Sequence, residues 1–175
     1  MLQQVSGIDG SVSRVNSIME ETGGEEAVVL NRLDIEGLVV ERAPFFKIWE
    51  AKYFPAKKTL LSMTEIGVEE CAGHFPSYPV VPLIRISERM AQTGLLLIGV
   101  SNKKEGKTPV AVSHNDGRAL SNNLFHPPLS LVIKAEIMKC KFGVYIVDTC
   151  AYSASAEPVA ELLGIKYVFI PSPPM

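Results

Sequence analysis

The sequence has 175 residues, of which 47% are hydrophobic and 21% charged, and its formal net charge is −2 at pH 7. These values are typical of a single globular domain with a sizeable core, and they exclude nucleic-acid binding through clustered Lys and Arg side chains. The N-terminus has no basic start followed by an apolar run, and no apolar stretch is long enough to span a bilayer. We therefore expect a cytoplasmic protein without membrane insertion.

Residues 1–40 are the least regularly patterned part of the chain. Their glycine-rich and acidic patches predict turns and solvated surface, and residues 27–30 are either a short strand or a helical turn. We interpret residues 1–40 as an N-terminal extension and residues 41–175 as the main domain.

Two strands are predicted in the next part of the chain. Apolar and polar side chains alternate over residues 47–54, and a second stretch with strand character covers residues 58–63. A tight turn at residues 55–57, which begins with a proline, joins the two strands into a hairpin. A polar link over residues 64–70 follows.

A proline-rich segment leads into the longest predicted helix. Pro76, Pro79 and Pro82 fix φ and remove backbone donors, so residues 74–81 are predicted to form a stiff, extended lead-in. Pro82 suits a first helical position, and no proline interrupts residues 83–100. Because the second half of that run is almost wholly apolar, we predict a buried helix.

Glu88 and Gln92 lie one turn apart on the same face of this helix, where a side-chain amide can hydrogen-bond a carboxylate and orient it. A carboxylate near the start of a buried helix, with His74 held just ahead of it by prolines, is the usual material of general acid–base catalysis. Residue type and spacing alone leave another interpretation open. In that interpretation Glu88 lies in solvent at the helix rim and His74 is a structural loop histidine.

The rest of the chain is rich in strands. A strand over residues 108–113 is followed by a turn at residues 115–117 and a polar loop to residue 128. Longer strands over residues 131–138, 144–152 and 160–170 are predicted to form an antiparallel meander. Long strands with one apolar face need a cover, and only the predicted helix is hydrophobic enough. The pattern therefore predicts an α+β fold with one central helix against a curled sheet.

Neither the cysteines nor the histidines show the spacing of metal ligands. The cysteines are odd in number and not closely paired, which favours buried thiols over a disulfide framework: Cys71, Cys140 and Cys150. Cys71 shortly precedes His74, but a histidine that activates a cysteine normally comes from a separate part of the fold. The histidines come from separate predicted loops: His74, His114 and His126. We predict no metal site.

The segment from Gly73 to Gln92 resembles the active-site segment of the 3-hydroxyacyl-acyl-carrier-protein dehydratases. The pattern of that family is Gly-His-Phe-Pro-Gly-x-Pro-x-x-Pro-Gly, followed by a hydrophobic helix with Glu or Asp and, four residues later, Gln. The residues that match this pattern without a gap are Gly73, His74, Phe75, Pro76, Pro79, Pro82, Glu88, Ala91 and Gln92. Ser77 and Leu83 stand where the family has glycines.

The resemblance implies a hot-dog fold, in which a long central helix is wrapped by a curled antiparallel sheet. It also implies a homodimer, or a higher assembly of dimers, in which a histidine of one subunit faces an acid of the other. The implied reaction is dehydration of a 3-hydroxyacyl thioester on acyl-carrier protein to the trans-2-enoyl thioester, as in fatty-acid biosynthesis. This chemistry requires neither a metal nor an organic cofactor.

By this resemblance, His74 would remove the C2 proton, and Glu88, kept protonated by an apolar site, would give a proton to the departing hydroxyl. The Leu83 backbone amide would stabilise the developing enolate oxygen. Gln92 would hold Glu88 in place, and Ser77 would belong to the substrate-binding segment.

Two other functions stay open on the same fold. The glycine replacements at Ser77 and Leu83 favour a catalytically impaired protein that binds acyl chains or serves as a scaffold. A thioesterase would use an acid and a water on the helix. The presence of both His74 and Glu88 in the dehydratase register favours the dehydratase over the thioesterase.

Overall fold

The computed structural model of the protein describes residues 26–39, 43–75, 77–102 and 106–171. Most of the predicted N-terminal extension, and Pro76 of the predicted lead-in, lie outside these residues. In the described part of the chain, no helix is long and apolar enough to cross a membrane.

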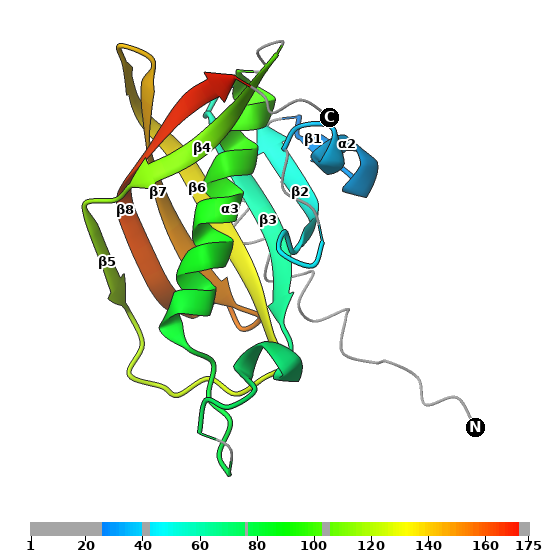
Figure 1. Ribbon diagram of the computed structural model, residues 1–175, viewed down its shortest axis with the longest axis vertical. Coiled ribbons are helices and arrows are strands. Elements are labelled where there is room, and N and C mark those ends of the chain that lie inside the picture. Colours follow the sequence, from blue (N-terminus) through cyan, green and yellow to red (C-terminus); the bar gives the residue numbers. More distant parts are fainter. Residues whose placement is uncertain (1–25, 40–42, 76, 103–105, 172–175) are drawn as a thin grey trace.

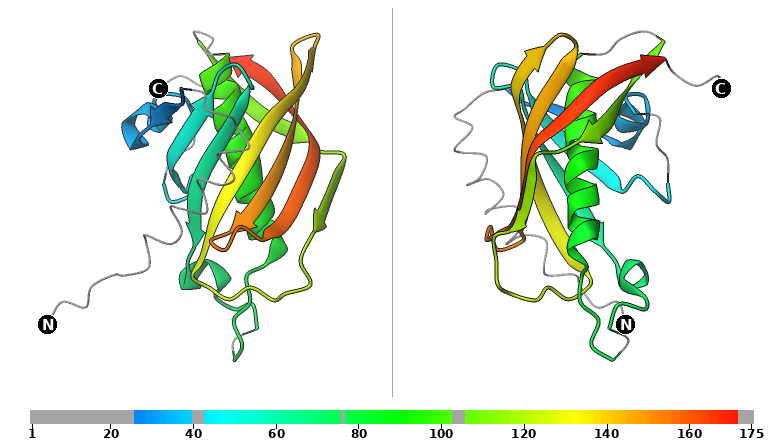
Figure 2. Two further views of the ribbon diagram at one scale, coloured as in Figure 1. Left: turned by 180° about the vertical axis from the view of Figure 1, so that it is seen from behind. Right: turned by 60° about the vertical axis from the view of Figure 1, so that its left-hand side comes forward.

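An antiparallel sheet curls around one long helix, which lies against the concave face of the sheet (Figure 1, Figure 2). The strands are β1 (Val28–Leu30), β2 (Ile48–Phe54), β3 (Thr59–Ile66), β4 (Lys107–Ser113), β5 (Asp116–Ala119), β6 (Leu129–Lys141), β7 (Val144–Ser153) and β8 (Pro158–Pro171). The helical elements are α2 (Arg32–Glu36), the 3-10 turn η1 (Val68–Cys71) and α3 (Leu83–Ser101). The strand order is β1-β2-β3-β6-β7-β8-β4, and β5 pairs with β8. The predicted α+β arrangement is confirmed.

The long helix α3 begins at Leu83, one residue after the position predicted for its start, because Pro82 is the N-cap with φ of −66° and an extended ψ of 135°. Its first residue, Leu83, is exposed, whereas its second half is buried in the core. Gly94 allows a close approach between helix and sheet. A Cβ at Gly94 would overlap the Tyr167 hydroxyl of β8, which donates a hydrogen bond to the Ala91 carbonyl at 2.7 Å. The apolar half of α3 is therefore the centre of the core.

The strands β6, β7 and β8 carry the alternation that the sequence predicts. Along β7, buried side chains alternate with half-buried ones over the whole strand. Ile133 of β6, Val147 of β7 and Ile165 of β8 belong to the same core cluster as the buried side of α3. Phe142 and Gly143, with φ of 52° and 78°, form the two-residue turn between β6 and β7.

Part of the predicted extension packs on the sheet and on α3. β1 pairs antiparallel with β2. Asn31 begins α2 with a capping box, and Ile35 of this short helix is buried in the core. Gly99 of α3 leaves room for the Leu38 carbonyl, which would lie 2.9 Å from a Cβ at that position. The domain boundary at residue 40 stays a prediction.

Three segments differ from the pattern-based expectation. The first part of the predicted extended lead-in turns instead: Phe75 has φ of 54°, and the Tyr78 amide donates to the Phe75 carbonyl at 2.9 Å. β3 continues into the predicted polar link because Thr64 and Ile66 are buried and pair with Leu131 and Leu129 of β6. β5 forms where a turn and a loop are predicted. All four residues of β5 are exposed, so they carry no alternation, and the strand exists through its pairing with β8.

Candidate active site

His74 belongs to the loop between η1 and α3. This loop leads into the N-terminal end of the helix (Figure 1). Its backbone amide donates to the Cys71 carbonyl at 3.0 Å, and its ring Nδ1 lies 2.9 Å from the Val80 carbonyl oxygen. A carbonyl oxygen can only accept, so Nδ1 carries the hydrogen and the neutral ring keeps a lone pair on Nε2. The Phe75 ring packs edge-on against the imidazole, with centroids 4.6 Å apart. The bond to Val80 therefore fixes the orientation and the tautomer of the His74 ring.

Glu88 lies in the second turn of α3 with its side chain 21% exposed. Its Oε2 is 3.3 Å from Arg85 Nη1 and 4.0 Å from Arg89 Nη1. Arg85 precedes Glu88 by three residues, and this helical spacing places the two side chains next to each other. The apolar surroundings that we expect for Glu88 are therefore present only toward the following turns of α3. On that side Glu88 lines an open cavity, together with Phe45, Ala91, Gln92, Leu95, Val110 and Ala111.

Gln92 is bonded to the segment that enters β2. Its Nε2 donates to the Phe45 carbonyl at 3.0 Å, and its Oε1 accepts from the Lys47 amide at 3.3 Å. Among the described residues, Gln92 makes no hydrogen bond to Glu88. The predicted orientation of Glu88 by Gln92 is therefore not formed, because the main chain of the segment just before β2 supplies both partners of the amide.

Leu83 and Ser77 occupy separate positions near the start of α3. The Leu83 amide is in the first turn, where backbone N–H groups have no partner within the helix. Its side chain lines a second cavity with Val80, Val81, Ile86, Phe125, Val159 and residues of the 119–124 segment. Ser77 is exposed.

The predicted site residues therefore divide into two groups within one chain. His74 and Leu83 lie at the start of α3, and Val80, the hydrogen-bond partner of His74, lines the same cavity as Leu83. Glu88 and Gln92 line the other cavity, and His74 is not among the residues of its wall.

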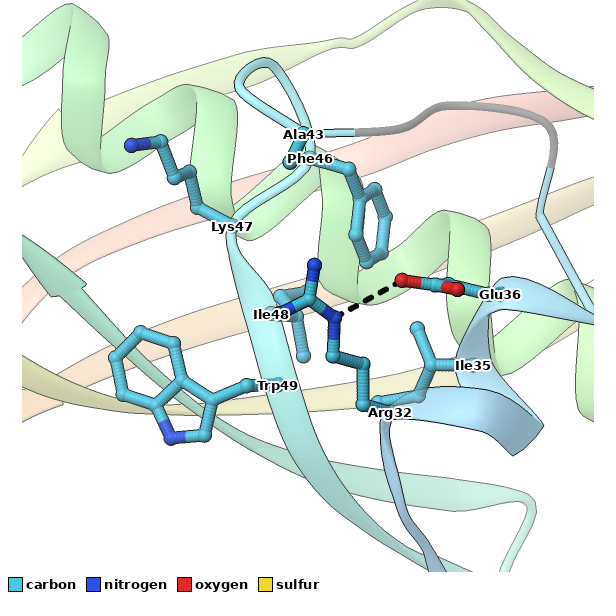
Figure 3. Close-up of a pocket in the computed structure, with 8 residues that line it drawn as sticks. All are labelled: Arg32, Ile35, Glu36, Ala43, Phe46, Lys47, Ile48 and Trp49. Atoms are coloured by element: carbon cyan, nitrogen blue, oxygen red, sulfur yellow. Dashed lines mark hydrogen bonds and ion pairs between the residues drawn. The ribbon is translucent and has the colours of Figure 1, made fainter.

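A third cavity lies between α2 and the start of β2, and Figure 3 shows the residues that line it. Its walls include Arg32 and Glu36, whose side chains are paired at 2.9 Å, and the aromatic side chains of Phe46 and Trp49. The residues that line it include neither His74 nor Glu88. This cavity is therefore separate from the candidate active site.

Arg89 is a charged residue of the site that sequence reasoning missed. Its side chain is 1% exposed and forms an ion pair with Glu70 of η1, which lies just before the His74 loop. Its Nε has no hydrogen-bond partner among the described residues. The pair joins the segment that carries His74 to the turn of α3 that carries Glu88. The signal in the sequence was an arginine close to the almost wholly apolar half of the predicted helix.

Cys71 lies next to this ion pair and is buried. Desolvation by burial, followed by the negative charge of Glu70, raises the pKa of the Cys71 thiol above its ordinary value of 9.0. A thiol with a raised pKa is a poor nucleophile at neutral pH. The burial of Cys71 thus argues against covalent catalysis by its thiol.

A curled antiparallel sheet on one central helix is the architecture of the hot-dog fold, and solved structures support that assignment. A thioesterase superfamily member of Thermus thermophilus superposes with a TM-score of 0.54 at 16% identity, covering 74% of this chain and 87% of that one. A thioesterase of Haemophilus influenzae gives a TM-score of 0.52 at 12% identity, covering 65% and 72%. The protein therefore has the hot-dog fold.

Sequence comparison identifies the family within this fold. The 3-hydroxyacyl-[acyl-carrier-protein] dehydratase FabZ of Vibrio atlanticus is 32% identical over 143 residues, covering 80% of this chain and 89% of the relative. The FabZ of Coxiella burnetii is 28% identical over 142 residues, covering 79% and 98%. No family model matches the sequence. The chain belongs to the FabZ family of 3-hydroxyacyl-acyl-carrier-protein dehydratases.

Proposed function

We propose that the protein dehydrates a 3-hydroxyacyl thioester carried on acyl-carrier protein to the trans-2-enoyl thioester, as in fatty-acid biosynthesis. The names of its relatives support the reaction and the carrier. The observation that carries the proposal for this chain is the hydrogen bond from His74 Nδ1 to the Val80 carbonyl, which leaves Nε2 free to take a proton. A histidine held in this tautomer is suited to remove the acidic C2 proton of a thioester.

The proposed reaction breaks the C2–H bond and then the C3–O bond. His74 Nε2 takes the proton from C2, and the developing negative charge on the thioester oxygen is stabilised by the Leu83 amide at the N-terminus of α3. This step requires the protonated form of Glu88, which gives its proton to the C3 hydroxyl and becomes the carboxylate, and the hydroxyl leaves as water. Leu83 retains the backbone amide that a glycine would supply at this position. We assign Ser77 and Gln92 to the substrate-binding surface of the proposed site.

The proposed site is completed by a second copy of the chain. β4 is at the end of the sheet and, among the described strands, pairs only with β8. Val110 and Ala111 of β4 form one wall of the cavity that Glu88 lines, and Val112 is 56% exposed. A second copy that paired along β4 would cover this cavity and could bring its own histidine loop to Glu88. We therefore propose a homodimer with shared sites.

Hydrolysis of an acyl thioester is the second candidate function. The ion pair between Glu88 and Arg85 favours it, because a paired carboxylate can act as a base toward a water molecule in the adjoining cavity. The two reactions consume the same class of substrate and differ in the product.

The test mixes purified protein with a crotonyl-type thioester. Loss of enoyl absorbance without release of thiol is expected, since dehydratases also catalyse the reverse hydration. Release of free thiol instead would support hydrolysis, and inertness in both assays, with acyl-carrier protein as the carrier, would exclude both reactions. His74→Ala and Glu88→Gln are expected to abolish turnover. Glu157→Gln, at an exposed acid in the β7–β8 turn, is the matched control and should keep full activity.

A further inference from the structure

A second histidine is bonded to the segment that orients His74. His126 lies in the connection between β5 and β6, which runs past the N-terminal end of α3 (Figure 1). Its Nδ1 lies 2.6 Å from the Pro79 carbonyl oxygen, and its Nε2 lies 3.1 Å from the Tyr78 hydroxyl. The rings of His126 and Tyr78 pack edge to face, with centroids 4.6 Å apart. Because the Pro79 carbonyl can only accept, Nδ1 donates to it and neutral Nε2 accepts from the Tyr78 hydroxyl.

The residue next to His126 bonds the same segment. The Val81 amide donates to the Phe125 carbonyl at 2.8 Å. The peptide group between Val80 and Val81 is thus bonded at both polar atoms: its carbonyl accepts from His74, and its N–H donates to Phe125. Hydrogen bonds on the two sides of one peptide group polarise and strengthen each other. His126 bonds the carbonyl of the preceding peptide group, between Pro79 and Val80.

The segment has few internal means of holding this geometry. Residues 79–82 belong to neither helix nor strand, and Pro79 and Pro82 have no N–H to donate. Inside the loop, the Tyr78 amide donates to the Phe75 carbonyl at 2.9 Å. The position of the Val80 carbonyl, and with it the direction of the His74 ring, therefore depends on bonds from outside the segment.

We propose that His126 is a positioning residue for His74. His126 holds the Pro79 carbonyl, and the Tyr78 hydroxyl holds the other side of the His126 ring. The Val80 carbonyl is thereby placed where it keeps His74 in the Nδ1–H tautomer. The catalytic consequence rests on the proposed function, whereas the effect on the His74 ring does not.

The kinetic test uses a series of variants at one position. His126→Ala is expected to lower kcat by roughly 10- to 100-fold with little change in KM, because a misplacement of about 1 Å at a reacting group costs up to that factor. His126→Asn keeps a side-chain N–H near the Nδ1 position and should recover most of the loss. Tyr78→Phe removes one hydroxyl and should cost only a few fold. His114→Asn, at an exposed histidine of the β4–β5 connection, is the matched control and should match the wild type.

A second test measures the His74 ring without any substrate. The chain has three histidines, so the ring nitrogens can be assigned in a long-range proton–nitrogen correlation spectrum by substituting each in turn. Wild-type His74 should show the Nδ1–H tautomer, and His126→Ala should shift its nitrogen signals toward a mixture of tautomers, with partial return in His126→Asn. If His74 keeps its nitrogen signals in His126→Ala, the positioning role is wrong. This holds even if the wild type proves inert toward thioesters, which would refute the proposed function alone.

Discussion

The buried ion pair between Arg89 and Glu70 provides the sharpest test of how the site is held together. Arg89 is 1% exposed and Glu70 is 13% exposed, so the arginine depends on its partner much more than the glutamate does. The proposed perturbation is Glu70→Gln. It removes the charge and keeps the oxygen that accepts a hydrogen bond from the Gly67 amide at 3.3 Å.

The expected loss in the free energy of unfolding follows from the burial of Arg89. Removing one partner of a buried pair leaves an uncompensated charge and costs about 3 to 5 kcal/mol. The Glu88 carboxylate, 4.0 Å from Arg89, remains as a weaker counter-ion, so we expect the lower end, about 3 kcal/mol. Arg89→Met should cost less, about 1 to 2 kcal/mol, because Glu70 can turn to water and methionine fills much of the same volume.

Urea unfolding of the two single variants and of the double variant measures these values. The double variant should be more stable than Glu70→Gln alone, since it no longer buries an unpaired charge. The matched control is the Arg32–Glu36 pair of α2, whose side chains are 70% and 40% exposed (Figure 3). Removing either of these residues should change the free energy of unfolding by less than about 0.5 kcal/mol. If the changes in the free energy of unfolding of the two single variants simply add up in the double variant, the reasoning is refuted.

Three further predictions concern the core, the edge strand and pH. Gly94→Ala should destabilise the protein by about 1 to 3 kcal/mol in thermal unfolding, because the new Cβ overlaps the Tyr167 hydroxyl, and Tyr167→Phe in the same chain should recover part of the loss. Val112→Lys on the exposed edge of β4 should shift sedimentation toward the 19.1 kDa monomer, and an unchanged dimer would place the interface elsewhere. Burial raises the pKa values of Cys71 and Tyr167 above their ordinary values of 9.0 and 10.0. The unfolded chain therefore releases these protons first, and the free energy of unfolding should fall as the pH rises above about 9, whereas a flat profile there would contradict this burial.

The amino-acid pattern alone determined most of the architecture. The apolar run of α3, bounded by Pro82, predicted the central helix, and the alternation in β7 and its neighbours predicted the meander. The first signal is a continuous apolar run after a proline and the second is a two-residue alternation, so both can be recognised within one short stretch of sequence. β5 was not predicted because its four residues are all exposed and show no alternation of apolar and polar side chains. The register of His74 and Glu88 also came from the sequence, through its resemblance to the dehydratases.

Only the tertiary structure decided which polar groups meet around that motif. Gln92 bonds Phe45 at a separation of 47 residues, His126 bonds Pro79 at the same separation, and Arg89 pairs with Glu70 across 19 residues. Each bond requires donor and acceptor atoms to be placed within a fraction of an ångström and in a suitable direction. That placement results from the packing of α3 against distant strands and loops, and no local period in the sequence records it.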